Sequence, residues 1–124
     1  MVELRFKRPV RPVSVNETAS LHWAARKRKL DPWDAAVREA WETVDGSAIV
    51  GSPARVHVTL AFPEHRRRDP HNYTGTVVKK IVDTLVRLGV WPDDTPDYVY
   101  VDEPTLVVGD ECVVRLTPIA RSVS

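Results

Sequence analysis

The fold is decided by residues 54–62, ARVHVTLAF, in which apolar and polar side chains alternate. Five apolar side chains fall on one face: Ala54, Val56, Val58, Leu60 and Phe62. A period of two residues predicts a β-strand with one buried face. The chain then runs directly into residues 65–72, HRRRDPHN, so we expect this charged segment to lie at the end of a strand.

Two helices are predicted on either side of this strand. Apolar residues recur at helical spacing from Thr74 to Leu88, and Gly89 provides a C-terminal stop. A second apolar stripe runs from Pro32 to Val44, with Asp31 as the expected N-cap and Pro32 at the first helical position.

The rest of the chain completes a small sheet. Further strands are expected over Val2–Phe6, over Tyr98–Val101 with an extension towards Val108, and over Glu111–Thr117. Residues 17–30 are interpreted as a basic loop and residues 119–124 as a frayed tail. The order β-α-β-α-β-β predicts an α/β (α+β) fold over residues 1–124, a single domain with a small mixed β-sheet and both helices packed on one face.

Composition narrows the class of protein. The chain has 124 residues, a formal net charge of +1 and a single cysteine, Cys112, which excludes an internal disulfide. It has no apolar run near 18 residues and no signal-peptide pattern, so we expect a cytoplasmic protein without a membrane partner. Charge is unevenly distributed: residues 1–30 carry eight Lys and Arg, whereas residues 91–111 carry seven Asp and Glu and no Lys or Arg.

Two acidic groups flank the second helix. Asp69 and His71 precede it, and Asp93 and Asp94 follow it. Mg²⁺ prefers oxygen ligands and is typically bound by one or two carboxylates together with substrate phosphate. If the two groups converge, they form a metal site next to arginines suited to phosphate. Alternatively, Asp69 is only a helix cap and Asp93-Asp94 only shape a proline-rich turn.

These residues resemble the RusA-type Holliday junction resolvases of bacteria and phages. The resemblance rests on four motifs: Arg66-Arg67-Arg68-Asp69-x-x-Asn72, Lys79-x-x-x-Asp83-x-Leu85, Gly89-Val90-Trp91-x-Asp93-Asp94 and Pro12-x-Ser14-x-Asn16. It implies a homodimeric, Mg²⁺-dependent endonuclease that cuts four-way DNA junctions by paired nicks, in recombination, repair or phage DNA processing.

The resemblance also implies residue roles. Asp69 and Asp94 would bind metal, with Asp93 and His71 close by, and Lys79 would neutralise charge that develops on the phosphate. No small-molecule cofactor is expected. The residues expected to bind the DNA are Arg66, Arg67, Arg68, Asn72, Lys80, Arg26, Lys27, Arg28 and Lys29, with Asn16 near the DNA or the dimer interface.

The chain departs from the family pattern twice. His71 stands where the family has an aspartate, which favours weaker Mg²⁺ binding, use of Mn²⁺, or a proton-shuttle role for the imidazole. The segment from Asn72 to Asp83 is about one helical turn longer, through residues 73–76. Three alternatives stay open: a broader branched-DNA or flap nuclease, a non-catalytic junction-binding protein, and an α/β interaction module with a solvated charged surface.

Overall fold

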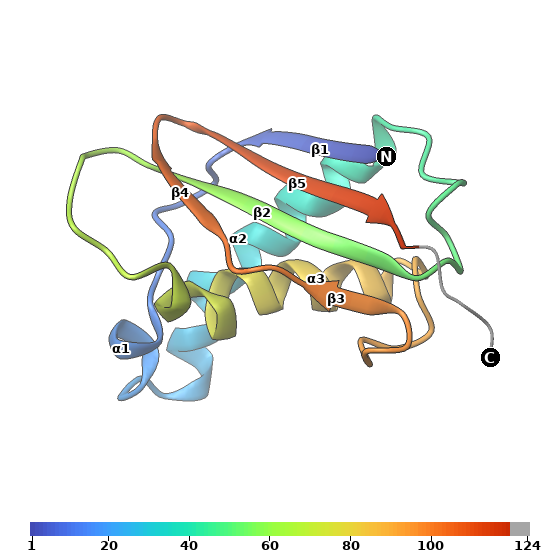
Figure 1. Ribbon diagram of the computed structural model, residues 1–124. Coiled ribbons are helices and arrows are strands. Elements are labelled where there is room, and N and C mark those ends of the chain that lie inside the picture. The colour runs from blue at the N-terminus through green and yellow to red at the C-terminus, as the bar shows by residue number, and fades with distance from the viewer. Residues whose placement is uncertain (120–124) are drawn as a thin grey trace.

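A computed structural model describes residues 1–119 (Figure 1). Along the described residues, two helices follow the first strand, a short 3-10 turn and a π turn (η1 and η2) lead from the second strand into the last helix, and three strands come after it. The elements are β1 (Val2–Lys7), α1 (Val15–Thr18), α2 (Trp23–Glu42), β2 (Ala54–Phe62), η1 (Pro70–Tyr73), η2 (Thr74–Val78), α3 (Lys79–Arg87), β3 (Val99–Val101), β4 (Thr105–Val108) and β5 (Glu111–Pro118).

The five strands form one mixed sheet in the order β1-β5-β2-β3, with β4 also paired to β2. β5 is antiparallel to both of its neighbours and pairs Val114 with Leu4 of β1 and with Val58 of β2. β3 and β4 are parallel to β2 and share its other edge: Ala54 pairs with Val99, and Thr59 pairs with Thr105. The predicted small mixed sheet is confirmed.

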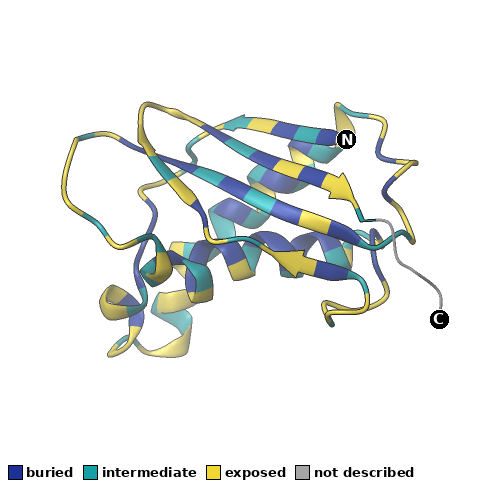
Figure 2. Cartoon of the chain, in the orientation of Figure 1, coloured by how far each residue is buried: buried dark blue, intermediate teal, exposed yellow. Residues whose placement is uncertain are grey.

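The core lies between the sheet and the two long helices, which cover the same face of the sheet (Figures 1 and 2). The alternating residues of β2 are fully buried, as its period of two predicted. Trp33 of α2 and Leu85 of α3 are also fully buried, and the ring of Phe6 meets the Trp33 ring edge-on at 6.1 Å. The expected arrangement of both helices on one face is therefore confirmed.

The prediction of a loop over residues 17–30 is wrong. Residues 15–18 form α1, and α2 begins at Trp23, so the basic cluster lies on the first turns of a helix. His22 caps α2 through its Nδ1, which accepts the Ala24 N–H at 3.3 Å. Asp31, the expected N-cap, lies within the helix. Pro32 is inside the helix, where it lacks one backbone N–H donor and its ring crowds the carbonyl of Arg28. The Asp31-Pro32 pair is favourable for the start of a helix, but it does not mark the start of α2.

Other boundaries differ by a few residues. The strand predicted from Tyr98 towards Val108 is divided into β3 and β4, and the break contains Pro104, which cannot donate to a strand ladder. The predicted tail begins later than expected, because the Ile119 N–H donates to the carbonyl of Pro53 at 2.9 Å. The remainder of that tail, 120–124, lies outside the described residues. No helix within 1–119 is long and apolar enough to cross a membrane.

Candidate functional site

Asp69 caps the helical run that begins at η1. Pro70 restricts Asp69 to an extended backbone (φ −93°, ψ 116°), and the Asp69 Oδ1 accepts the backbone N–H of His71 at 3.1 Å. The Asn72 N–H donates to the Asp69 carbonyl at 3.0 Å. Within the described chain the second carboxylate oxygen of Asp69 has no hydrogen bond. The side chains of Asp69 and His71 are exposed, so both are accessible to a ligand.

Asp93 and Asp94 lie on a turn after α3. Gly89 ends that helix with a positive φ of 85°. Trp91 then anchors the chain, because its ring is buried and its indole N–H donates to the Ser52 carbonyl at 2.8 Å. The Asp94 N–H donates to the Asp93 Oδ1 at 2.6 Å, and both aspartates are exposed beside a shallow depression of about 320 Å³.

The two acidic groups do not meet within one chain. Because β2 and β3 are parallel and Ala54 pairs with Val99, Asp94 lies near the start of β2, whereas Asp69 lies beyond its end. The helical run from Pro70 to Arg87 separates them by roughly 27 Å at about 1.5 Å per residue. Across residues 1–119, no group of three or more His, Cys, Asp or Glu is arranged to hold a metal. The expected convergence on one cation therefore does not occur in a single protomer.

The candidate DNA-binding cations fall into two classes. Arg26, Arg28, Lys29, Arg66 and Arg67 are exposed, and none has an ion-pair partner in the part of the chain that is described. Arg68 is different: its side chain is only 8% exposed, it forms an ion pair with Glu64 at 2.5 Å, and its guanidinium lies 3.8 Å from the centre of the Phe62 ring. Arg68 therefore anchors the loop after β2, contrary to its expected exposure to DNA.

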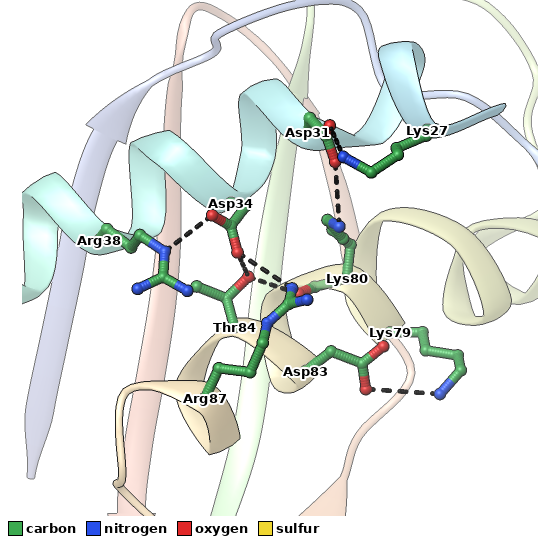
Figure 3. A network of polar contacts seen from close by, with 9 residues as sticks. All are labelled: Lys27, Asp31, Asp34, Arg38, Lys79, Lys80, Asp83, Thr84 and Arg87. Carbon is green, nitrogen blue, oxygen red and sulfur yellow. Dashed lines mark hydrogen bonds and ion pairs between the residues drawn. The ribbon is translucent and has the colours of Figure 1, made fainter. Parts of the chain in front are cut away.

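Lys79 and Lys80 also differ from each other (Figure 3). Lys80 is largely buried and its Nζ lies 3.2 Å from Asp31 Oδ1, which joins α3 to α2. Lys27 binds the same carboxylate at 2.7 Å, and the hydrogen bonds from Lys27 and then Lys80 hold the pKa of Asp31 below its usual range. Lys79 is exposed and makes a longer ion pair with Asp83, at 3.4 Å. Lys79 is thus the more accessible of the two lysines.

The N-terminal segment supports the same end of the helical run. The Thr76 hydroxyl donates to the Val13 carbonyl at 2.6 Å, and Ser14 forms a capping box with Glu17 at the start of α1. Contacts join α1, which includes the exposed Asn16, to η1, which includes His71 and Asn72. The two short helical segments lie side by side (Figure 1). Contacts between α2 and η2 bring the basic first turns of α2 to the same end.

The geometry therefore brings together one acidic group, Asn16 and the basic cluster, but not the second acidic group. The sequence interpretation missed Trp23, which is 69% exposed beside the basic cluster, because the segment was assigned to a loop. The apolar spacing from Trp23 to Leu30 and Trp33 was the signal for a longer helix. Comparison with protein-family models and with curated protein sequences finds no match for this chain.

Proposed function

We propose that this protein is a divalent-cation-dependent endonuclease of branched DNA, with four-way junctions as its substrate, and that it acts as a homodimer. The observation that supports the proposal is the placement of unpaired cations at one end of the helical run: Arg66 and Arg67 precede the Asp69-His71-Asn72 turn, and contacts of α2 with η2 bring the basic first turns of α2 to the same end. Exposed arginines and lysines without carboxylate partners are suited to DNA phosphates. An acidic turn beside such cations is unfavourable for binding a polyanion unless a cation lies between the carboxylate and the phosphate.

The dimer supplies the acidic group that one chain lacks. In a two-fold dimer with antiparallel helical runs, the start of one run faces the end of the other. Asp69 and His71 of one protomer would then lie beside Asp93 and Asp94 of the second, and two identical sites would result. Carboxylates with one imidazole suit Mg²⁺ or Mn²⁺. A two-fold pair of sites also matches the two symmetric nicks that resolve a four-way junction.

The free edge formed by β3 and β4 is a suitable interface for that dimer. Among the described strands, β3 and β4 pair with β2 alone, and their exposed apolar side chains include Tyr100 (56%) and Val108 (58%). Antiparallel pairing of two such edges sets the start of one β3 beside the end of the other β4. Asp94 lies five residues before Val99, the first residue of β3. His65 and Arg66, in the loop after β2, line a groove together with residues of β4. Edge pairing therefore brings the two ends of the site together.

Each residue has a defined part in this proposal. Asp69 and Asp94 from different protomers would hold the cation, with His71 and Asp93 as additional donors. When bound, the cation neutralises charge on the scissile phosphate and activates a water molecule. Arg66 and Arg67 bind the flanking phosphates. Lys79 neutralises further phosphate charge once its exposed ion pair with Asp83 is broken. Breaking that pair costs little free energy, because exposed ion pairs are worth about 1 kcal/mol or less.

Complementation between two inactive variants tests the shared site. Asp69→Asn and Asp94→Asn should each abolish junction nicking in Mg²⁺ or Mn²⁺ while junction binding is retained. A mixed dimer of the two variants contains one site with Asp69 and Asp94 both intact. Refolding an equal mixture should therefore restore about a quarter of the wild-type nicking, because about half of the dimers are mixed and each has one of two sites.

A site built within one protomer predicts no recovery in the mixture, since every site then lacks one aspartate. If wild-type protein binds the junction but never nicks it, whichever of the two cations is present, the nuclease proposal fails. In that case the protein is a junction-binding protein, a function that the separation of the acidic groups within one chain also favours. Parallel assays on three-way and flap substrates distinguish a junction resolvase from a broader branched-DNA nuclease.

A further inference from the structure

Trp23 is a large aromatic side chain placed in solvent at the first residue of α2. It is 69% exposed, whereas Trp33 and Trp91 are almost completely buried. The His22 ring lies 5.6 Å from the Trp23 ring with an interplanar angle of 40°, and His22 is itself held by its cap hydrogen bond to Ala24. The indole is therefore supported from one side and free on the other.

Trp23 stands at the rim of a groove between two elements that are far apart in the sequence. One wall is formed by Trp23, Arg26 and Lys27 of α2, and the other includes Gly75 of η2 and Lys79 of α3. The groove has a volume of about 300 Å³, which is large enough for a planar ring. Because Gly75 has no side chain, it does not project into the groove from the opposite wall.

Positive charge dominates this groove. Four of its lining residues are cations, and the only acidic lining residue among those described is Asp83. Arg26 has no ion-pair partner within residues 1–119, and the Lys79–Asp83 pair at 3.4 Å is exposed. An aromatic face beside exposed cations binds single-stranded nucleic acid through base stacking and phosphate contacts. An acidic peptide would use the cations but would leave the indole without a planar partner.

We propose that Trp23 stacks on an unpaired nucleobase, while Arg26 and Lys79 bind the phosphates on either side of it. The inference deepens the proposed function and rests on it for the identity of the substrate: branched DNA with an unpaired base at its branch point offers such a base for stacking. A fully paired duplex offers no such face, so Trp23 contributes to discrimination between branched and linear DNA.

A fluorescence titration with a short oligo-dT in EDTA tests the stacking directly. Binding should quench the emission of the exposed tryptophan in the wild type. Trp23→Ala should weaken binding to oligo-dT, and to a junction with an unpaired base, by about 5- to 150-fold, the range found for one stacked base. Trp23→Phe should recover most of the affinity. Trp41→Phe changes the half-buried tryptophan further along the same helix and should leave both quenching and affinity unchanged.

Three results would overturn the inference: wild type that does not bind oligo-dT, Trp23→Ala that binds as tightly as wild type, or Trp23→Ala that changes only the oligomeric state. The last would assign the indole to a protein contact. Because the titration contains no divalent cation, it is independent of cleavage. If Trp23 stacks on the base but wild-type protein never nicks a junction in Mg²⁺ or Mn²⁺, only the nuclease proposal is refuted. If the protein nicks junctions but Trp23→Ala has no effect on oligo-dT binding, only the stacking inference is refuted.

Discussion

The salt dependence of DNA binding can be calculated from the cations that have no ion-pair partner. Five candidate DNA-binding cations are of this kind within the described chain: Arg26, Arg28, Lys29, Arg66 and Arg67. If each neutralises one phosphate, log K against log salt should have a slope of about −4.5 per protomer, since each phosphate contributes about −0.9. An increase from about 50 to about 200 mM salt should then weaken binding by roughly 500-fold per protomer.

The double variant Arg66→Ala/Arg67→Ala removes two of these contacts. Its slope should fall to about −2.7 per protomer, and the same increase in salt should weaken binding by only about 40-fold. Fluorescence anisotropy of a labelled junction in EDTA measures both slopes without cleavage. Arg115→Ala is the control, because Arg115 pairs with Glu3 at 3.0 Å on the uncovered face of the sheet and should not alter the slope. Equal slopes for the double variant and wild type would refute the assignment of Arg66 and Arg67 to the DNA.

Three further predictions concern the fold and its titratable groups. Asp34→Asn should lower the free energy of unfolding by about 1–3 kcal/mol at neutral pH, because Asp34 accepts hydrogen bonds from Thr84 at 2.7 Å and Arg38 at 2.8 Å. Burial alone would raise the pKa of Asp34, but these hydrogen bonds outweigh it and hold the pKa low. The wild-type advantage should therefore be present above about pH 4 and be lost as the pH falls through the folded pKa, which urea titrations at neutral and acid pH can measure. Arg68→Met should destabilise the fold by about 1 kcal/mol through loss of its buried contacts, yet leave the salt slope unchanged, in contrast to its neighbours. Burial raises the pKa of the Cys112 thiol, so a thiol reagent should modify native protein only as fast as the protein unfolds, and denatured protein at once; rapid modification of the native state would contradict this.

The sheet was predictable from the sequence, because its signal is local. The alternation over residues 54–62 defines β2 with the bounds observed, since a strand with one buried face requires a period of two. The start of α2 was not predictable in the same way. Asp31-Pro32 is a favourable helix start, but contacts with α3, including the Lys80–Asp31 ion pair, stabilise a helix that begins earlier. The apolar spacing from Trp23 to Leu30 and Trp33 indicated that longer helix only weakly beside the Asp31-Pro32 pair.

The candidate site was predictable in its residue types but not in its arrangement. Asp69 ends the loop after β2 as expected, and the cations expected to bind DNA are exposed, with the exceptions of Arg68 and Lys80. Whether Asp94 returns to Asp69 depends on the direction in which β3 pairs with β2. The direction is defined by the parallel register of the two strands, in which Ala54 pairs with Val99 and Val56 pairs with Val101.

That pairing has a consequence for any chemistry that uses both acidic groups. In a parallel β-α-β unit, the residues that leave the first strand and those that enter the second are always at opposite ends of the sheet. Here β2 runs from Ala54 to Phe62, which at about 3.3 Å per residue is close to 30 Å, far beyond the reach of two aspartate side chains. Changes of rotamer or loop conformation cannot close such a gap without breaking the β2–β3 pairing. In the proposed dimer, a two-fold copy of the chain closes the gap by reversing the direction, and the proposal then requires that catalysis and self-association be lost together. A monomeric variant that still cuts junctions would therefore show that Asp94 is not part of the metal site, whatever the role of Asp69.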